Sequence, residues 1–236
     1  MTWPLLICFS LSVSILSASS LTGRANIVGG SSRTSHSTDC SGVVVWLQPL
    51  TDAPVAITRD AAKIRIRQKN KTFSPHVLVV PVGTTVDFPK DDPIFHNAFS
   101  NYNGQIFDIG LYPPGTTRSI TFRREGVVRV FCNIHAAMSA VIVVVNTRYF
   151  AITKKNGAFQ MEGVPKGIYR LAFYYERATE KTLESLSRTV VIRNEDEDLG
   201  ITNISEAGYL AIPHLNKYGK PYKPAPDVSA YPGTQQ

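Results

Sequence analysis

Cysteine is scarce in this chain. The 236 residues include three cysteines, and one of them, Cys8, falls within the first 20 residues. Cys40 and Cys132 therefore allow at most one disulfide in the remainder, a bond that an exported protein could form. That disulfide would use up the thiol of Cys132, so it competes directly with the metal site inferred below. We favour a free or inert Cys40.

The first 20 residues lack charged side chains, and their apolar stretch is short. Residues 5–16 are largely apolar but serine-rich, and they are too few for a membrane span. The small residues Ser17, Ala18 and Ser19 follow, which is typical of a cleavage site. We therefore predict a signal peptide over residues 1–19, a periplasmic or otherwise exported protein, and no membrane span in the mature chain. An uncleaved anchor is the alternative.

Motifs for nucleic-acid binding and for common enzyme chemistry are also missing. The sequence has no helix-turn-helix, zinc-finger or RNA-binding signature, and no dense basic cluster with interleaved aromatic residues. It has no phosphate-binding loop and no Ser-His-Asp elbow. The net charge of +7 therefore favours an acidic protein partner over a nucleic acid.

Long stretches of helical period are absent, and short runs of strand character take their place. Residues 63–71 alternate strictly, with Ile64 and Ile66 on one face and basic side chains on the other. Further runs, separated by turn residues, are 41–47, 77–82, 84–88, 96–100, 116–122, 127–131, 141–145, 151–159, 167–173, 186–193 and 198–201. Short strands at this spacing predict an all-β fold of the sandwich or barrel type. Residues 176–187 suit one short helix.

The loop between runs 127–131 and 141–145 holds three side chains that bind soft metals. Cys132, His135 and Met138 follow one another at steps of three. A thiolate and a thioether are soft ligands, imidazole suits copper, and one further histidine would complete a blue-copper set. His96, beyond the 84–88 run, is the candidate. The alternatives are an inert buried cysteine, a thiol nucleophile, and a zinc site, which would prefer a second cysteine or a carboxylate to Met138.

The order His-Asn, then Cys-x-x-His-x-x-Met between two strands, resembles the cupredoxins, with the tight spacing of the amicyanin branch. Residues 69–145 also resemble bacterial cupredoxin-domain proteins labelled methylamine-utilisation proteins, a label that proves no pathway. The resemblance implies a Greek-key β-sandwich over residues 63–146 that binds one type 1 copper through His96, Cys132, His135 and Met138. It also implies that Asn97 ties the two ligand loops together, and that electrons enter or leave at His135.

A second sandwich is indicated beyond this segment. Residues 141–145 are apolar without alternation, so both faces of that strand should be covered. The pattern Gly157-x-Phe159, then Val164-Pro165-x-Gly167-x-Tyr169-x-Leu171, resembles the transthyretin-like sandwich of carboxypeptidase regulatory-like domains. The resemblance covers residues 147–206 and lacks the family's opening strands. We therefore predict that residues 25–60 supply them and that the 63–146 domain is inserted; alternatively, residues 41–47 are an added strand of the 63–146 sandwich.

The flanks of these domains have little apolar content. Residues 21–39 are rich in Gly, Ser and Thr and predict a flexible lead. Residues 207–236 are rich in Pro, Tyr and Lys and predict a disordered tail or an extended arm. We expect His36 and His214 to be solvated and His76 to be a hydrogen-bonded structural residue.

These observations predict an exported type 1 copper protein that transfers single electrons between protein redox partners. We expect it not to be an enzyme, because four protein ligands leave no open position for a substrate. A copper carrier or sensor and a non-redox two-sandwich binding module are the alternatives. The rim around His135 would include Ala136, Ala137, Pro113 and Pro114. A basic stripe would either steer an acidic partner or protect an edge strand; it comprises Lys63, Arg65, Arg67 and Lys69.

Overall fold

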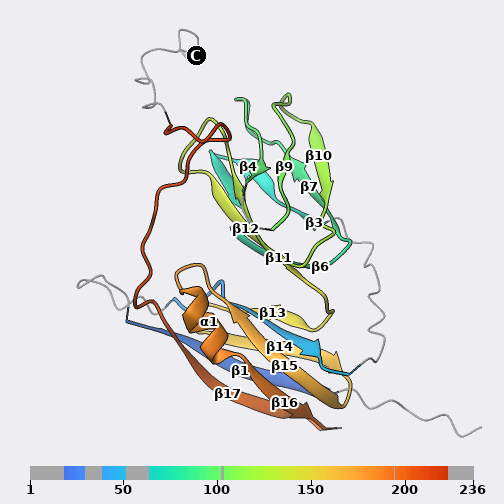
Figure 1. Ribbon diagram of the computed structural model, residues 1–236. Helices are drawn as coiled ribbons and strands as arrows, with labels where there is room; N and C mark the ends of the chain where they lie inside the picture. Colours follow the sequence, from blue (N-terminus) through green and yellow to red (C-terminus); the bar gives the residue numbers. More distant parts are fainter. Residues whose placement is uncertain (1–18, 30–38, 52–63, 102–103, 194, 223–236) are drawn as a thin grey trace, which may run out of the picture.

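The computed structural model describes residues 19–29, 39–51, 64–101, 104–193 and 195–222. Within these ranges the chain is almost entirely β-structure, and it forms two stacked β-sandwiches (Figure 1). One sandwich contains strands β3 to β12 and carries the loop with Cys132, His135 and Met138; we name it the ligand-loop sandwich. The other contains β1, β2, β13 to β17 and the helix α1, and we name it the terminal sandwich. None of the described helical residues form a segment long and apolar enough to cross a membrane. The predicted all-β fold is confirmed.

The ligand-loop sandwich follows the predicted runs closely. Its strands are β3 (Ile64–Arg65), β4 (Arg67–Lys69), β5 (Thr72–Ser74), β6 (Val77–Pro81), β7 (Thr85–Pro89), β8 (Phe99–Ser100), β9 (Phe107–Asp108), β10 (Thr117–Thr121), β11 (Gly126–Phe131) and β12 (Ser139–Val145). One sheet has the order β6-β12-β11-β8-β9, a second β10-β7-β3, and β4 and β5 form a hairpin. Val128 and Val130 of β11 and Cys132, which directly follows this strand, alternate into the same core, as the strand period predicts.

The terminal sandwich joins strands from both ends of the chain. Its elements are β1 (Ser19–Val28), β2 (Val44–Pro49), β13 (Phe150–Ile152), β14 (Ala158–Val164), β15 (Gly167–Tyr174), α1 (Glu180–Leu186), β16 (Arg188–Ile192) and β17 (Glu197–Ser205). The sheets β13-β2-β15-β16 and β14-β1-β17 face each other across a second core. Strand β2 pairs antiparallel with β15, with Val45 opposite Phe173. Residues 44–49 therefore do not extend the ligand-loop sandwich.

Strand β1 corrects the prediction of a flexible lead. Residues 21–28 pair with β17 in parallel and, in part, with β14 antiparallel. Leu21 and Ala25 are buried between them, and a Cβ at Gly23 would lie 2.5 Å from the ring of Phe159. The glycine that suggested flexibility therefore permits close packing. Residues 30–38 and 1–18, which include nearly all of the predicted signal peptide, lie outside the described residues; Ser19 is buried at the start of β1.

The two sandwiches pack through the outer face of β12. Ala140, Ile142 and Val144 face the ligand-loop core. Val141, Val143 and Val145 face the other way and form one buried cluster with residues of the terminal sandwich, Val44 and Tyr174 among them. The expectation that both faces of this strand are covered is confirmed. At the edge of the junction, His76 Nε2 lies 2.6 Å from Glu176 Oε2, so His76 is the hydrogen-bonded residue that was expected.

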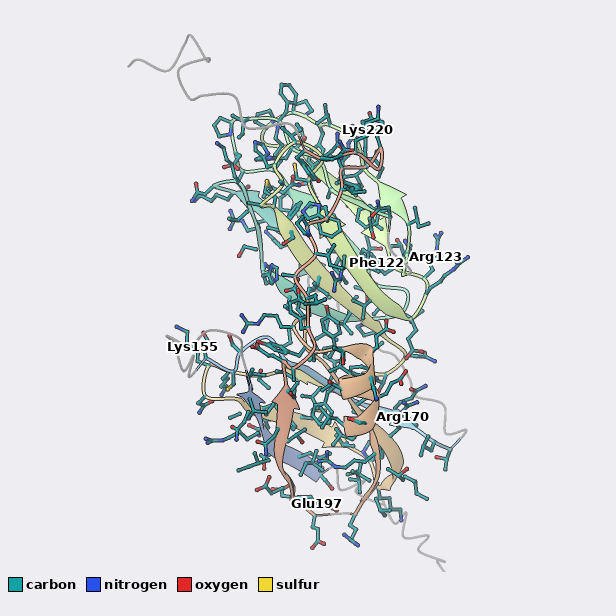
Figure 2. All side chains as sticks on the ribbon, turned by 60° about the vertical axis from the view of Figure 1, so that its left-hand side comes forward. Phe122, Arg123, Lys155, Arg170, Glu197 and Lys220 are labelled. Carbon is teal, nitrogen blue, oxygen red and sulfur yellow. The ribbon has the colours of Figure 1, made fainter. Side chains whose placement is uncertain are left out.

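Beyond β17, the chain returns from the terminal sandwich to the far end of the ligand-loop sandwich (dark red in Figure 1). Figure 2 shows Lys220 at that end, whereas Lys155, Arg170 and Glu197 mark the terminal sandwich. We name residues 209–222 the C-terminal arm. Of the two alternatives predicted for this tail, the extended arm and not the disordered tail describes residues 207–222, because tertiary contacts hold this segment although it has few core residues. Residues 223–236 lie outside the described part.

Candidate metal centre

The predicted ligands lie at one end of the ligand-loop sandwich. His96 follows β7 and forms an isolated bridge with Tyr112. Cys132 directly follows β11, and His135 and Met138 lie in the loop before β12, whose first residue pairs with Phe131. The Cys132 N–H donates to the Met138 carbonyl oxygen at 3.2 Å, and the Met138 N–H donates to the His135 carbonyl oxygen at 3.0 Å. We name residues 132–138 the ligand loop.

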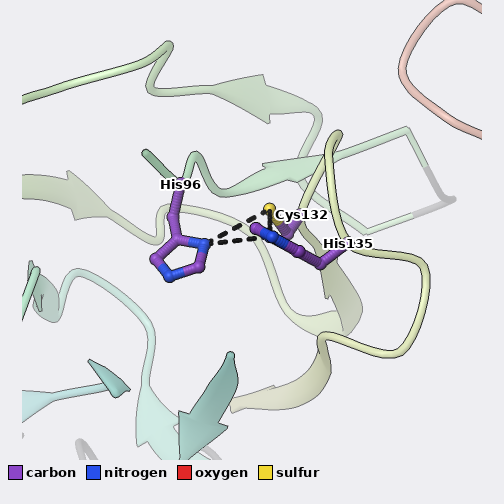
Figure 3. A group of neighbouring side chains, drawn as sticks. All are labelled: His96, Cys132 and His135. Atoms are coloured by element: carbon purple, nitrogen blue, oxygen red, sulfur yellow. Dashed lines mark hydrogen bonds between the residues drawn. The ribbon is translucent and has the colours of Figure 1, made fainter. Parts of the chain in front are cut away.

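Three of the four predicted ligands bring their donor atoms together (Figure 3). The Nδ1 atoms of His96 and His135 are 3.1 Å apart. Cys132 Sγ lies 3.9 Å from Nδ1 of His96 and 3.7 Å from Nδ1 of His135. Cys132, His96 and Met138 have no exposed surface, whereas His135 is partly exposed.

These separations fit one ion between the three atoms. Donors about 2.0–2.3 Å from a central ion lie roughly 3.5–4 Å from one another at about 120°, which fits the two sulfur–nitrogen distances, and about 3.1 Å apart at about 100°, which fits the two nitrogens. Met138, the fourth predicted ligand, is buried in the same core cluster as Cys132. The nearby carboxylate of Asp92 is bound to the other nitrogen of His96, so it does not provide the extra ligand that zinc would prefer.

Hydrogen bonds favour the thiolate form of Cys132. Burial by itself raises the pKa of the thiol, but a hydrogen bond with His96 and backbone N–H groups of Asn97, Ile134 and His135 outweigh it and lower the pKa below its ordinary value of 9.0. The thiolate is the form that binds metals. Full burial argues against an attacking nucleophile, and the two imidazoles that face the sulfur argue against an inert core cysteine.

Asp92 fixes the orientation of the His96 ring through Nε2, the ring nitrogen that is not directed at His135. Its Oδ2 lies 2.7 Å from His96 Nε2, and its carboxylate also accepts the backbone N–H groups of Asn70 at 2.6 Å and Lys71 at 2.8 Å. Burial raises the pKa of Asp92, and these hydrogen bonds together lower it below its ordinary value. An ionised carboxylate on Nε2–H leaves Nδ1 free to bind a metal. Sequence reasoning missed Asp92; its spacing of four from His96 was the only signal.

Asn97 connects the two ligand segments. Its Oδ1 accepts the backbone N–H of Asn133 at 2.6 Å, and its Nδ2 lies 3.3 Å from Asp108 Oδ1. The side chain is almost fully buried. This is the connection that the family resemblance implied.

Sequence reasoning allowed an extended arm but did not predict that the C-terminal arm contacts the ligand loop. The ring of His214 stacks on Phe131 at a centroid distance of 3.9 Å, and its Nε2 lies 2.8 Å from the Ala136 carbonyl oxygen. The expectation of a solvated His214 is therefore wrong. The Tyr222 hydroxyl donates to the Cys132 carbonyl oxygen at 2.8 Å. Only the aromatic content of the arm hinted at such packing.

Apolar side chains surround this end of the sandwich. Phe95, Leu111 and Ile134 are each about half exposed, at 57%, 54% and 46%. The predicted rim residues are exposed as well: Pro113, Pro114, Ala136 and Ala137. Of the predicted basic stripe, Arg65, Arg67 and Lys69 are exposed, and Arg67 forms an ion pair with Asp91 at 2.7 Å. Lys63 lies outside the described residues.

Cys40 and Cys132 are both free, so the competing disulfide does not form. The Cys40 N–H donates to the Lys155 carbonyl oxygen and the Cys40 carbonyl accepts from Thr153, which places this residue in the terminal sandwich. The thiol of Cys132 is thereby left for the metal centre.

No protein-family model matches this chain, and no curated protein matches it. Solved structures resemble part of it. A copper-containing nitrite reductase from Thermus scotoductus SA-01 is 28% identical over 42% of this chain and 25% of that chain, with a TM-score of 0.35. A purple cupredoxin from Nitrosopumilus maritimus is 27% identical over 35% of this chain and 100% of that chain, with a TM-score of 0.32. A Cu(I) amicyanin variant is 19% identical over 43% of this chain and 98% of that chain, with a TM-score of 0.34.

Proposed function

We propose that this chain is an exported, cupredoxin-type copper protein that transfers single electrons between protein partners. The observation that supports this most is the convergence of three donor atoms, from His96, Cys132 and His135, within 4.8 Å of one another at the end of a β-sandwich. Met138 would supply the fourth, axial donor. Export is proposed from the sequence of residues 1–19.

A copper ion held by these residues would exchange one electron by passing between Cu(I) and Cu(II). The chain's own contribution is to hold the donors in one arrangement. Asp92 fixes His96, and Asn97 fixes the ligand loop through Asn133. Such supporting hydrogen bonds restrict ligand movement and so suit a site that keeps the same geometry in two oxidation states. Burial of His96 and Cys132 keeps water from the donors.

The exposed surroundings of His135 suit brief contact with a partner. His135 is the ligand nearest to solvent, and the rim beside it is apolar and uncharged at Ala136 and Ala137. Small contacts of this kind are typical of weak redox encounters. The net charge of +7 favours an acidic partner. Because Arg67 is paired with Asp91, Arg65 and Lys69 would contribute most of the steering from this edge.

We propose further that the terminal sandwich is of the transthyretin-like, carboxypeptidase regulatory-like type. In support, the residues of the motif have structural roles there. Phe159 and Val164 of β14, and Tyr169 and Leu171 of β15, are all buried in its core. The Tyr169 hydroxyl donates to the Pro165 carbonyl oxygen at 2.9 Å, which closes the turn between the two strands.

Copper titration of the purified protein tests the main proposal. We expect Cu(II) to produce an intense visible band that a reductant bleaches and an oxidant restores. Cys132→Ser should abolish the band, because it removes the thiolate, and Cys40→Ser should keep it. A wild-type protein without the band would refute the proposal. Rapid, complete loss of copper to a competing chelator would instead favour a carrier.

A further inference from the structure

The C-terminal arm contacts the ligand loop at three successive points. Tyr222 donates from its hydroxyl to the Cys132 carbonyl oxygen at 2.8 Å. The Lys217 backbone N–H donates to Asn133 Oδ1 at 3.0 Å. His214 Nε2 lies 2.8 Å from the Ala136 carbonyl oxygen. The arm therefore binds one residue that is itself a ligand and two residues beside ligands.

We propose that this arm is a working part of the metal centre, and that Tyr222 is a positioning residue that fixes the backbone of Cys132. The proposal deepens the function proposed above and rests on it, because it takes residues 132–138 to be the metal-binding loop.

The hydrogen bonds of the loop show why the arm matters. Within the loop, the N–H of Cys132 and the N–H and carbonyl of Met138 are used, together with the His135 carbonyl. The carbonyl oxygens of Cys132 and Ala136 take no part in these hydrogen bonds within the loop. They are hydrogen-bonded by the arm instead. The backbone of the loop therefore cannot turn at Cys132 or Ala136 without losing a hydrogen bond to the arm.

Aromatic packing holds Tyr222 in place. Its ring meets the edge of the His214 ring at a centroid distance of 5.2 Å, and His214 in turn stacks on Phe131. A tyrosine hydroxyl carries its proton at neutral pH, so Tyr222 is a hydrogen-bond donor to the Cys132 carbonyl.

Lys217 links the arm to both ligand segments. Its Nζ lies 2.7 Å from Asp108 Oδ2, and the other oxygen of Asp108 is 3.3 Å from Asn97 Nδ2. Asn97 accepts the N–H of Asn133, whose side chain accepts the Lys217 N–H. The arm, the His96 segment and the ligand loop are thus closed into one ring of hydrogen bonds.

The consequence is a ligand loop that is ordered before metal arrives and that releases metal slowly. One lost hydrogen bond of this kind changes an equilibrium by about five- to tenfold. The test uses the full chain with Tyr222→Phe, which removes the hydroxyl and keeps the ring. The matched control is Tyr209→Phe in the same arm, whose hydroxyl has no hydrogen bond to the ligand loop among the described residues.

The first measurement is amide hydrogen exchange of residues 133–138 in the metal-free protein. We expect exchange about five- to tenfold faster in Tyr222→Phe than in wild type, and unchanged exchange in Tyr209→Phe. The second set of measurements uses the copper-loaded protein and records its visible band, its reduction potential and its rate of copper release to a chelator. Tyr222→Phe should shift the band and the potential and should release copper several-fold faster than wild type. Lys217→Met should accelerate exchange in the same residues, because it opens the ring at Asp108.

Equal exchange in Tyr222→Phe, Tyr209→Phe and wild type would overturn the proposal, whatever the copper data show. Faster exchange without any change in band, potential or release would also overturn it, because the arm would then stabilise the loop without acting on the centre. If wild type forms no coloured complex, the proposed function fails separately, and the exchange data on metal-free protein still decide whether the arm orders the loop.

Discussion

Asp92 Oδ2 lies 2.7 Å from His96 Nε2, and both side chains are buried. The carboxylate is itself fixed by the backbone N–H groups of Asn70 and Lys71 in the β4–β5 turn, where both residues have positive φ. The position of one donor in the metal centre is therefore set by a hairpin on a different part of the sandwich. This pair gives the first prediction.

Asp92→Asn should weaken copper binding by about 10- to 100-fold, the usual effect of removing such a supporting partner. The amide would direct an N–H group at the backbone donors of Asn70 or Lys71, so His96 would lose its fixed orientation. Competition with a chelator of known affinity measures the change. Asp91→Asn is the control, because Asp91 pairs with Arg67 at the surface; equal losses in both variants would contradict the role of Asp92.

The junction between the sandwiches should depend on pH through His76 and Glu176. The hydrogen bond to Glu176 raises the pKa of His76 above 6.5, although burial opposes it. The same bond lowers the pKa of Glu176 below 4.5, again against burial. The His76 contribution to stability is full below pH 6.5 and is lost as pH rises through the raised pKa. The Glu176 contribution is full above pH 4.5 and is lost as pH falls through the lowered pKa.

The pair therefore stabilises the fold fully between pH 4.5 and 6.5, the two ordinary pKa values. Urea unfolding of wild type and His76→Gln across this range and up to about pH 9 measures the difference. We expect the two proteins to differ most inside the window and to converge at high pH. The effect is small because the His76 side chain is 48% exposed. A difference that does not vary with pH would exclude this ion pair as its source.

Val143→Ala should destabilise the chain by about 1.5–3 kcal/mol, from lost apolar contact and the cavity that remains. Val143 is 2% exposed and faces the terminal sandwich from β12. Val191→Ala on β16 is the control; Val191 is 51% exposed, and its truncation should change stability by less than about 0.5 kcal/mol. Chemical denaturation measures both. Similar values for the two variants would show that the outer face of β12 is not packed as described.

Ala136→Asp should slow oxidation of the reduced copper protein even at high ionic strength. Ala136 is exposed beside His135, so a larger, hydrated side chain keeps a partner from that ligand. Stopped-flow mixing with hexacyanoferrate(III) and with a cationic cobalt complex measures the rate, and high salt screens the added charge. Thr189→Asp on β16 adds the same charge far from the site. Unchanged rates for Ala136→Asp with both oxidants would exclude His135 as the residue through which electrons leave the protein.

Salt dependence separates the two interpretations of the basic edge. Arg65→Glu with Lys69→Glu should slow reaction with an acidic protein at low salt only, if these residues steer the partner. The copper spectrum should not change, since the side chains of Arg65 and Lys69 are exposed and are not among the predicted ligands. A rate that is insensitive to these substitutions at every ionic strength would leave edge protection as their role.

The sequence by itself identified the candidate ligands and the pattern of burial around them. Donor chemistry is a property of residue type, and the spacing of Cys132, His135 and Met138 on one loop makes their proximity local. The period of two likewise assigned Val128 and Val130 to the core, and the unbroken apolar run of β12 required a cover on both faces.

Only the tertiary structure decided which residues come into contact across long distances in the sequence. Tyr222 and Cys132 are 90 residues apart, and Ser19 and Arg193 are 174 apart. Composition described residues 21–39 as a flexible lead and residues 207–236 as a disordered tail or an extended arm, because they hold few apolar residues. The order of their described parts comes instead from strand pairing, one aromatic stack and single hydrogen bonds to distant backbone groups. Such contacts need a partner surface that exists only after folding, and they leave no periodic trace in the sequence.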